Sequence, residues 1–210
     1  MTLRDEPEVD ELITLADGGD REARQLLLAS HQARLRQMVA LRIDRRLAAR
    51  FDPSDVVQEA LADAGEALSE YLRLRPLPFY AWLRRFAWDR LVELHRRHVL
   101  AQRRSVAREE PGAIAWTDPS AVALADHLVA SGTSPSRFLD RKELRERVQA
   151  ALALLPPRDR EILVLLYMEE LSAAEIGGVL GMTEGAVRTR HVRALERMRS
   201  LMPADGSREG

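Results

Sequence analysis

The 210-residue sequence contains no cysteine, and this absence excludes several classes of protein. A chain without thiols has no disulfide framework, no cysteine-ligated zinc or iron–sulfur centre and no cysteine nucleophile. Long hydrophobic runs are also missing: the longest purely apolar stretch, residues 162–168, is far shorter than the ~20 residues of a membrane-spanning helix. The acidic N-terminus does not have the charged-then-apolar layout of a signal peptide. We therefore expect a soluble protein in a reducing, cytoplasmic setting.

Net charge is nearly absent too, at −1 from 32 basic and 33 acidic residues, which by itself argues against a nucleic-acid-binding protein. The charges are nevertheless sorted along the chain. Residues 5–22 carry a net charge of −7 and residues 52–70 one of −6, whereas residues 73–108 carry +8 and residues 188–199 carry +4. Acidic and basic segments cancel in the total, so each has to be interpreted separately.

Strand signals are lacking as well: helix-forming residues dominate, and no stretch shows sustained alternation of β-branched residues. The sequence predicts an all-α fold of two small helical domains joined by a flexible linker. Residues 105–136 are rich in proline, glycine, serine and threonine. This segment is longer than an ordinary loop within a compact domain, so it is predicted to be the linker, with a short helix at residues 122–129. The predicted domains are residues 1–104 and 137–202, and a tail follows at 203–210.

In the first domain we expect helices over residues 26–49, from Asp52 to about residue 73, and from residue 79 to about 104. Asp52 has the side chain of an N-cap, and Pro53 suits the first helical turn. Pro76 and Pro78 separate the second helix from the third. In the second domain the expected helices are 137–154, 158–168, 172–180 and 183–201.

The helix after Asp52 is predicted to carry an acidic and polar stripe on one face. No basic residue interrupts this stripe, so its carboxylates are either solvated by water, the default for a charge run, or neutralised by a basic partner surface. The stripe comprises Asp55, Gln58, Glu59, Asp63, Glu66 and Glu70.

The next helix has the opposite charge, and aromatic residues are interleaved with its arginines. This combination suits single-stranded nucleic acid, because rings stack on bases and guanidinium groups pair with phosphates. The alternative is that some of the rings lie in the core, since the chain has only ten aromatic residues and a small domain needs several inside. The interleaved residues include Tyr80, Trp82, Arg84, Arg85, Trp88, Arg90, Arg96 and Arg97.

The last two expected helices have the spacing of a helix-turn-helix. A small residue at Gly177 lets the helices cross closely, Gly181 suits the left-handed turn, and Val187 packs at the crossing. Ser172 and Glu175 form a capping-box pattern at the start of the first helix.

One face of the final helix is rich in arginine, as in a recognition helix that enters the major groove. The alternative is an ordinary amphipathic helix with solvated arginines. His191 lies on the opposite, apolar face and is interpreted as a packed core histidine. The exposed face comprises Gly185, Arg188, Thr189, Val192, Arg193, Glu196 and Arg199.

Signatures of catalysis are missing. The sequence has no P-loop, no glycine-rich dinucleotide turn, no His-Glu-x-x-His motif and no supported Ser/His/Asp arrangement. We therefore expect a protein that is not an enzyme and that has no catalytic residue, no cofactor and no metal site.

Taken in order, the acidic helix, the aromatic-arginine helix, the linker and the helix-turn-helix resemble a bacterial RNA polymerase sigma factor of the extracytoplasmic-function (ECF) group. The resemblance covers residues 10–202. It is carried by residues 52–61, which look like region 2.2, by residues 79–97, which look like regions 2.3 and 2.4, and by residues 155–163 and 171–199, which look like region 4. The family implies a factor that directs core polymerase to promoters for transcription initiation.

The resemblance also implies partners and site residues. The partners are core RNA polymerase, through its β′ clamp helices and β flap, and promoter DNA, with an anti-sigma factor left open and no membrane. The turn at residues 73–79 corresponds to a loop that captures a flipped minus-ten base, and the linker would thread near the RNA exit path. Polymerase-binding residues would be Asp55, Gln58, Glu59 and Asp63. Minus-ten DNA would be met by Tyr80, Trp82, Arg84, Arg85, Trp88, Asp89, Arg96 and Arg97, and minus-thirty-five DNA by Thr183, Gly185, Arg188, Thr189, Val192 and Arg193.

Two positions depart from the family pattern. Asp89 stands where asparagine is usual, and His191 stands where an aliphatic residue is common. Both bear on promoter specificity. A stand-alone helix-turn-helix regulator is the rival interpretation, but it gives the acidic stripe no purpose.

Overall fold

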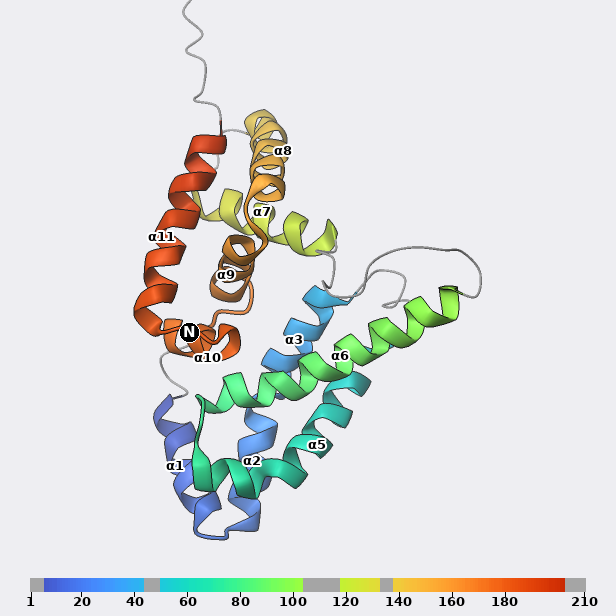
Figure 1. Ribbon diagram of the computed structural model, residues 1–210, viewed down its shortest axis with the longest axis vertical. Helices are drawn as coiled ribbons and strands as arrows, with labels where there is room; N and C mark the ends of the chain where they lie inside the picture. The colour runs from blue at the N-terminus through green and yellow to red at the C-terminus, as the bar shows by residue number, and fades with distance from the viewer. Residues whose placement is uncertain (1–5, 44–49, 104–117, 133–137, 203–210) are drawn as a thin grey trace, which may run out of the picture. The chain divides into compact units, whose positions relative to one another are not determined.

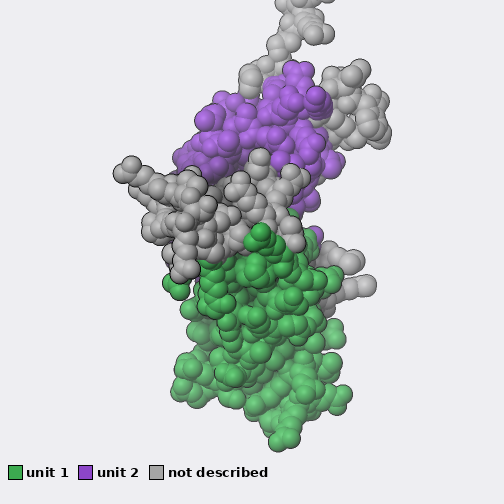
Figure 2. All heavy atoms as spheres, turned by 90° about the vertical axis from the view of Figure 1, so that its right-hand side faces the viewer, with its two compact units in different colours: residues 1–117 green, residues 118–210 purple. Residues whose placement is uncertain are grey.

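In the computed structural model, residues 6–43, 50–103, 118–132 and 138–202 are described, and every regular element in these ranges is a helix (Figure 1). The predicted all-α fold is confirmed. The described parts of residues 1–117 and of residues 118–210 form two compact units, coloured separately in Figure 2. Among the described helices, none combines the length and apolar character that crossing a membrane requires.

The first unit is built on two long helices, α5 (Pro53–Leu74) and α6 (Phe79–Arg103), which pack against each other. α3 (Gln32–Arg42) packs on both of them, while α1 (Glu6–Asp17) packs on α2 (Arg21–Ser30) and on α5. The core is aliphatic at its centre. Its fully buried large side chains are Leu27, Leu35, Met38, Leu83 and Leu91.

The prediction of one continuous helix over residues 26–49 is wrong. The chain turns at His31, which has φ −103° and ψ 3° and ends α2 by donating its backbone N–H to the Ala29 carbonyl. The His31 ring is buried and lies 5.6 Å from the Phe79 ring and 5.4 Å from the Tyr80 ring. Helical periodicity does not reveal this turn, because the apolar residues on both sides of it face the same core. Residues 44–49 lie outside the described part of the chain.

The predicted start of α5 is confirmed. The Asp52 carboxylate accepts a 2.8 Å hydrogen bond from the Ser54 backbone N–H, and this bond is the main cause that lowers the pKa of Asp52. Pro53 occupies the first turn, where its missing N–H costs no hydrogen bond. α5 ends in a left-handed residue, Arg75, with φ 40°.

The second unit consists of α7 (Asp118–Gly132), α8 (Phe138–Leu154), α9 (Pro157–Tyr167), α10 (Ala173–Leu180) and α11 (Glu184–Leu201). α11 packs on α8, α9 and α10, and α7 packs on α8 and α9. α7 lies in the segment expected to be the linker and is longer than the short helix expected there. Its residues Leu124, Ala125 and Val129 are buried, so α7 belongs to this compact unit. The rest of the expected linker, like the tail at 203–210, lies outside the described residues.

Candidate nucleic-acid and protein interfaces

The crossing of α10 and α11 depends on two glycines. A Cβ atom built on Gly177 would lie 2.6 Å from the Met182 carbonyl oxygen, so no larger residue fits without a shift of the backbone. Gly181 ends α10 with φ 65°, in the left-handed region that favours glycine. Val187, only 1% exposed, fills the crossing from α11. These positions have the geometry predicted for a helix-turn-helix.

Side-chain caps define where both helices begin. The Glu175 backbone N–H donates to the Ser172 hydroxyl at 3.2 Å, and the Ser172 backbone N–H donates to the Glu175 carboxylate at 2.8 Å. This is the predicted capping box. Thr183 caps α11 by accepting a 3.2 Å hydrogen bond from the Ala186 backbone N–H.

The residues that were predicted to meet minus-thirty-five DNA share one solvent-exposed side of α11 and its N-cap. Val192 is 53% exposed, a large value for an aliphatic side chain. Arg188 forms an ion pair with Glu184 one turn earlier while 72% of its side chain remains exposed. The exposed set is Thr183, Gly185, Arg188, Thr189, Val192 and Arg193. An apolar side chain among cations suits a DNA groove, where it can meet a thymine methyl group.

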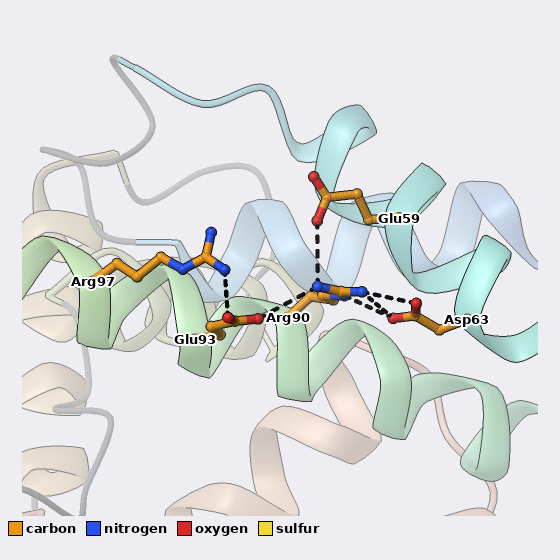
Figure 3. Close-up of polar contacts among 5 residues, drawn as sticks. All are labelled: Glu59, Asp63, Arg90, Glu93 and Arg97. Atoms are coloured by element: carbon orange, nitrogen blue, oxygen red, sulfur yellow. Dashed lines mark hydrogen bonds and ion pairs between the residues drawn. The ribbon is translucent and has the colours of Figure 1, made fainter.

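The predicted acidic face of α5 is exposed at Asp55, Gln58 and Glu59, while Asp63 is half-buried. The acidic stripe was expected to have no basic residue within it, but in the structure an arginine from the neighbouring helix reaches it. Arg90 of α6 donates two hydrogen bonds to Asp63, from Nε at 2.7 Å and from Nη2 at 2.8 Å (Figure 3). These bonds are the main cause that lowers the pKa of Asp63 and raises that of Arg90. Asp63 therefore joins α5 to α6 as well as facing solvent.

The predicted DNA face of α6 divides into buried and exposed residues. Tyr80, Trp82 and Arg84 are 2%, 8% and 4% exposed, so they do not present a surface to DNA in this structure. Trp82 packs in an aromatic cluster, with its ring centroid 4.5 Å from that of Tyr71 and 5.0 Å from that of Phe86. The core interpretation of these rings is the one that fits, because α6 is covered by both α3 and α5.

The other predicted residues of α6 reach solvent. Trp88 is half-buried, and the Arg84 and Arg42 guanidinium carbons lie 5.4 Å and 5.5 Å from its ring centroid. Such cation–π contacts hold an aromatic ring in a fixed position. The remaining residues, all exposed, are Arg85, Asp89, Arg96 and Arg97.

Comparison with known proteins finds similarity to sigma factors. Residues 145–198 match the family model described as Sigma-70, region 4. ECF RNA polymerase sigma factor SigD of Mycobacterium tuberculosis (H37Rv) is 28% identical over 206 residues, which cover 98% of this chain and 89% of SigD. RNA polymerase sigma-H factor of Pseudomonas aeruginosa is 27% identical over 92% of this chain and 93% of its own. Over nearly its whole length, the chain is similar to ECF sigma factors.

A solved structure of CnrH in complex with the cytosolic domain of CnrY is also similar, with 26% sequence identity. The match covers 92% of this chain and 96% of that chain, with a TM-score of 0.49. As a sigma factor, the protein directs RNA polymerase core to promoters for transcription initiation, and a stand-alone helix-turn-helix regulator is not favoured.

Sequence reasoning missed a buried charge in the second unit, Asp159. Asp159 of α9 is 1% exposed and accepts a 2.8 Å hydrogen bond from Arg190 and another from Arg197, both on α11. These two arginines therefore pair with α9 while their side chains remain 40% and 49% exposed. Their spacing of seven residues, two helical turns, is the one sequence signal that separates them from the DNA-facing arginines.

His191 occupies the packed position that was expected of it. Its Nε2 atom lies 3.0 Å from the Tyr167 hydroxyl, and burial lowers its pKa. The imidazole is thus a hydrogen-bonded part of the contact between α9 and α11, on the side of α11 opposite the exposed arginines.

The turn between α5 and α6 is stabilised by a side-chain hydrogen bond and includes an exposed leucine. The Tyr71 hydroxyl donates a 3.0 Å hydrogen bond to the Leu77 carbonyl. Leu74 is 53% exposed beside it.

Proposed function

We propose that this sigma factor docks on core polymerase through the exposed acidic face of α5 and contacts promoter DNA through separate arginine surfaces on α6 and α11. The observation that carries the proposal is the sorting of exposed charge. Asp55, Gln58 and Glu59 lie together on α5, whereas Arg188 and Arg193 lie on the open side of the helix-turn-helix.

The docking partner is the β′ clamp helices, and its contact surface has to be basic. Within the described residues, no ion pair is recorded for Asp55, and Glu59 has only a 3.7 Å contact with Arg90. Carboxylates that are solvated and close together repel one another, so a cationic partner relieves this repulsion. At Asp63 the partner surface has to compete with Arg90, which pairs with this carboxylate in the free protein.

The minus-ten element is met by the exposed residues of α6 and by the preceding turn. Arg85, Arg96 and Arg97 supply phosphate contacts, and Trp88 supplies a partly open ring. Asp89 reduces the local positive charge, so this surface binds DNA more weakly than its arginines alone would. Tyr80, Trp82 and Arg84 support the helix from inside.

The minus-thirty-five element is met by α11, placed in the major groove with its N-terminal residues toward the bases. Arg188 and Arg193 contact base edges or phosphates, and Val192 supplies an apolar contact. The same unit contacts the β flap. The protein acts in the cytoplasm, performs no chemistry of its own, and is open to control by an anti-sigma factor.

Run-off transcription tests this function directly. Purified core polymerase is combined with the protein on a promoter library, and the transcripts are sequenced. We expect initiation from a defined subset of promoters that core polymerase alone does not use. Failure to associate with core polymerase together with no stimulation would overturn the proposal, and tight duplex binding without polymerase would support the stand-alone regulator.

A further inference from the structure

A chain of ion pairs connects the acidic face of α5 with an exposed arginine of α6 (Figure 3). It consists of Glu59 and Asp63 on α5 and of Arg90, Glu93 and Arg97 on α6. We call these five residues the Arg90–Glu93 relay. The relay joins two side chains assigned to polymerase docking with one assigned to DNA, through two residues assigned to neither.

Arg90 is shared between the two helices. Its Nε and Nη2 atoms donate hydrogen bonds to the Asp63 carboxylate. Its Nη1 atom lies 3.7 Å from a carboxylate oxygen of Glu59 and 3.4 Å from one of Glu93. A guanidinium group is rigid and planar, so it cannot hold all three carboxylates equally well. Whatever removes Glu59 and Asp63 from Arg90 therefore strengthens its pairing with Glu93.

Glu93 is shared in the same way. One of its oxygens faces Arg90, and the other accepts a 2.5 Å hydrogen bond from Arg97, whose side chain is 72% exposed. In the free protein, Arg97 therefore reaches solvent with its charge offset by Glu93. When Arg90 pairs more strongly with Glu93, the ion pair between Glu93 and Arg97 weakens, and less of the Arg97 charge is neutralised.

The charge count of the relay gives the direction of the effect. Three carboxylates and two guanidinium groups leave the free relay with a charge of −1, which repels a phosphate. When a basic polymerase surface neutralises Glu59 and Asp63, the remaining Arg90, Glu93 and Arg97 carry +1, which attracts a phosphate. The sign of the local charge thus reverses on docking.

We propose that Arg90 and Glu93 are positioning residues that couple polymerase docking on α5 to phosphate binding by Arg97 on α6. This inference rests on the proposed function. By linkage, the coupling is reciprocal: phosphate bound at Arg97 strengthens docking by the same factor. The coupling predicts that the near-neutral protein binds DNA weakly when free and more tightly within the holoenzyme.

Glu93→Gln tests the relay, because it removes the charge and keeps the shape of the side chain. The full-length protein is titrated onto labelled forked minus-ten DNA, free and as holoenzyme, over a range of salt concentrations. We expect E93Q to tighten DNA binding of the free protein by about two- to fivefold, the range for one exposed ion pair. Its salt dependence should steepen by about one phosphate contact. The holoenzyme, where Arg97 is already released, should change by less than twofold.

Two comparisons separate coupling from a simple loss of negative charge. Asp89→Asn removes one exposed carboxylate from the same helix outside the relay, and it should tighten DNA binding equally in free protein and holoenzyme. In an Arg97→Ala background, E93Q should have no effect on the free protein. A purely structural role for Glu93 would move thermal stability and leave the salt slope unchanged.

The outcomes distinguish this inference from the proposed function. Equal gains for E93Q in free protein and holoenzyme, or no gain in the free protein, would overturn the relay while the sigma function stands. Wild-type protein that neither binds core polymerase nor confers promoter binding would overturn the proposed function and the relay together.

Discussion

α6 and α11 are both arginine-rich helices, yet their arginines and aromatic residues are used differently. α11 packs through one side on α8, α9 and α10, and its opposite side is exposed from Gly185 to Arg193. α6 is covered by α3 as well as by α5, so its residues Tyr80, Trp82 and Arg84 are buried. Composition therefore identifies a DNA-facing helix only when a single side of that helix is covered.

The largest expected effect separates the two tryptophans of α6. Trp82→Ala should lower the free energy of unfolding by about 3–5 kcal/mol, as expected for a large aromatic residue removed from a core. Trp88→Ala should cost about 1 kcal/mol, because the half-buried ring loses mainly its cation–π contacts. Denaturant unfolding checks both values. If the two variants lost equal stability, the division of α6 into core and surface residues would be wrong.

The second prediction concerns the two helices of the helix-turn-helix. Gly177→Ala should destabilise the protein by about 1–3 kcal/mol, because the new methyl group meets the Met182 carbonyl. Gly185→Ala is the matched control, since nothing lies within 4 Å of its Cβ position. Alanine there should raise stability by about 0.5–1 kcal/mol through helix propensity. Thermal unfolding of both variants would reveal opposite signs, and equal signs would contradict the described crossing.

The third prediction compares an arginine of α11 on the predicted DNA face with one that pairs with Asp159. Arg188→Ala should weaken promoter binding by the holoenzyme by about 1–3 kcal/mol if the side chain reads a base, or reduce the salt slope by about one if it meets a phosphate. Arg190→Ala removes a partner of Asp159 and should affect stability while leaving promoter affinity nearly unchanged. Filter binding over a salt series distinguishes the pair. Equal losses of promoter affinity would show that Arg190 also faces DNA.

The smallest expected effect is a pH dependence of the folding stability, caused by His191 on the packed side of α11. Burial lowers the pKa of His191 below its usual value near 6.5, so the unfolded chain binds this proton more readily than the folded protein does. The stability that His191 contributes is present above that usual value and declines as the pH falls below it. Unfolding of wild type and His191→Gln at pH values from neutral to mildly acidic isolates this term. A difference between the two proteins that does not change with pH would exclude it.

Much of the fold could be predicted because its signals are local. Asp52 and Pro53 mark the start of α5, and the Ser172 capping box with Gly177 and Gly181 specifies the helix-turn-helix. The turn at His31 could not be predicted, since it is stabilised by rings from α6 that lie far away in the sequence.

For the candidate surfaces, too, local patterns could be predicted from the sequence and contacts between distant residues could not. Residues of α11 were assigned correctly to an exposed face, because a helix with one covered side obeys the helical wheel. The ion pairs of Arg90 with Asp63 and of Asp159 with Arg190 lie beyond any such pattern. They join residues 27 and 31 positions apart on different helices, and only the packing of those helices brings the charges together.

Core polymerase affinity tests whether the acidic face of α5 binds polymerase while the arginine faces of α6 and α11 bind DNA. The double variant D55N/E59Q removes two charges from the proposed docking site, and E66Q/E70Q removes two exposed charges farther along the same helix. Equilibrium binding of labelled protein to core polymerase should weaken by about tenfold for the first pair, equivalent to about 1.4 kcal/mol, and by less than twofold for the second. Equal affinities for the two variants would contradict the claim.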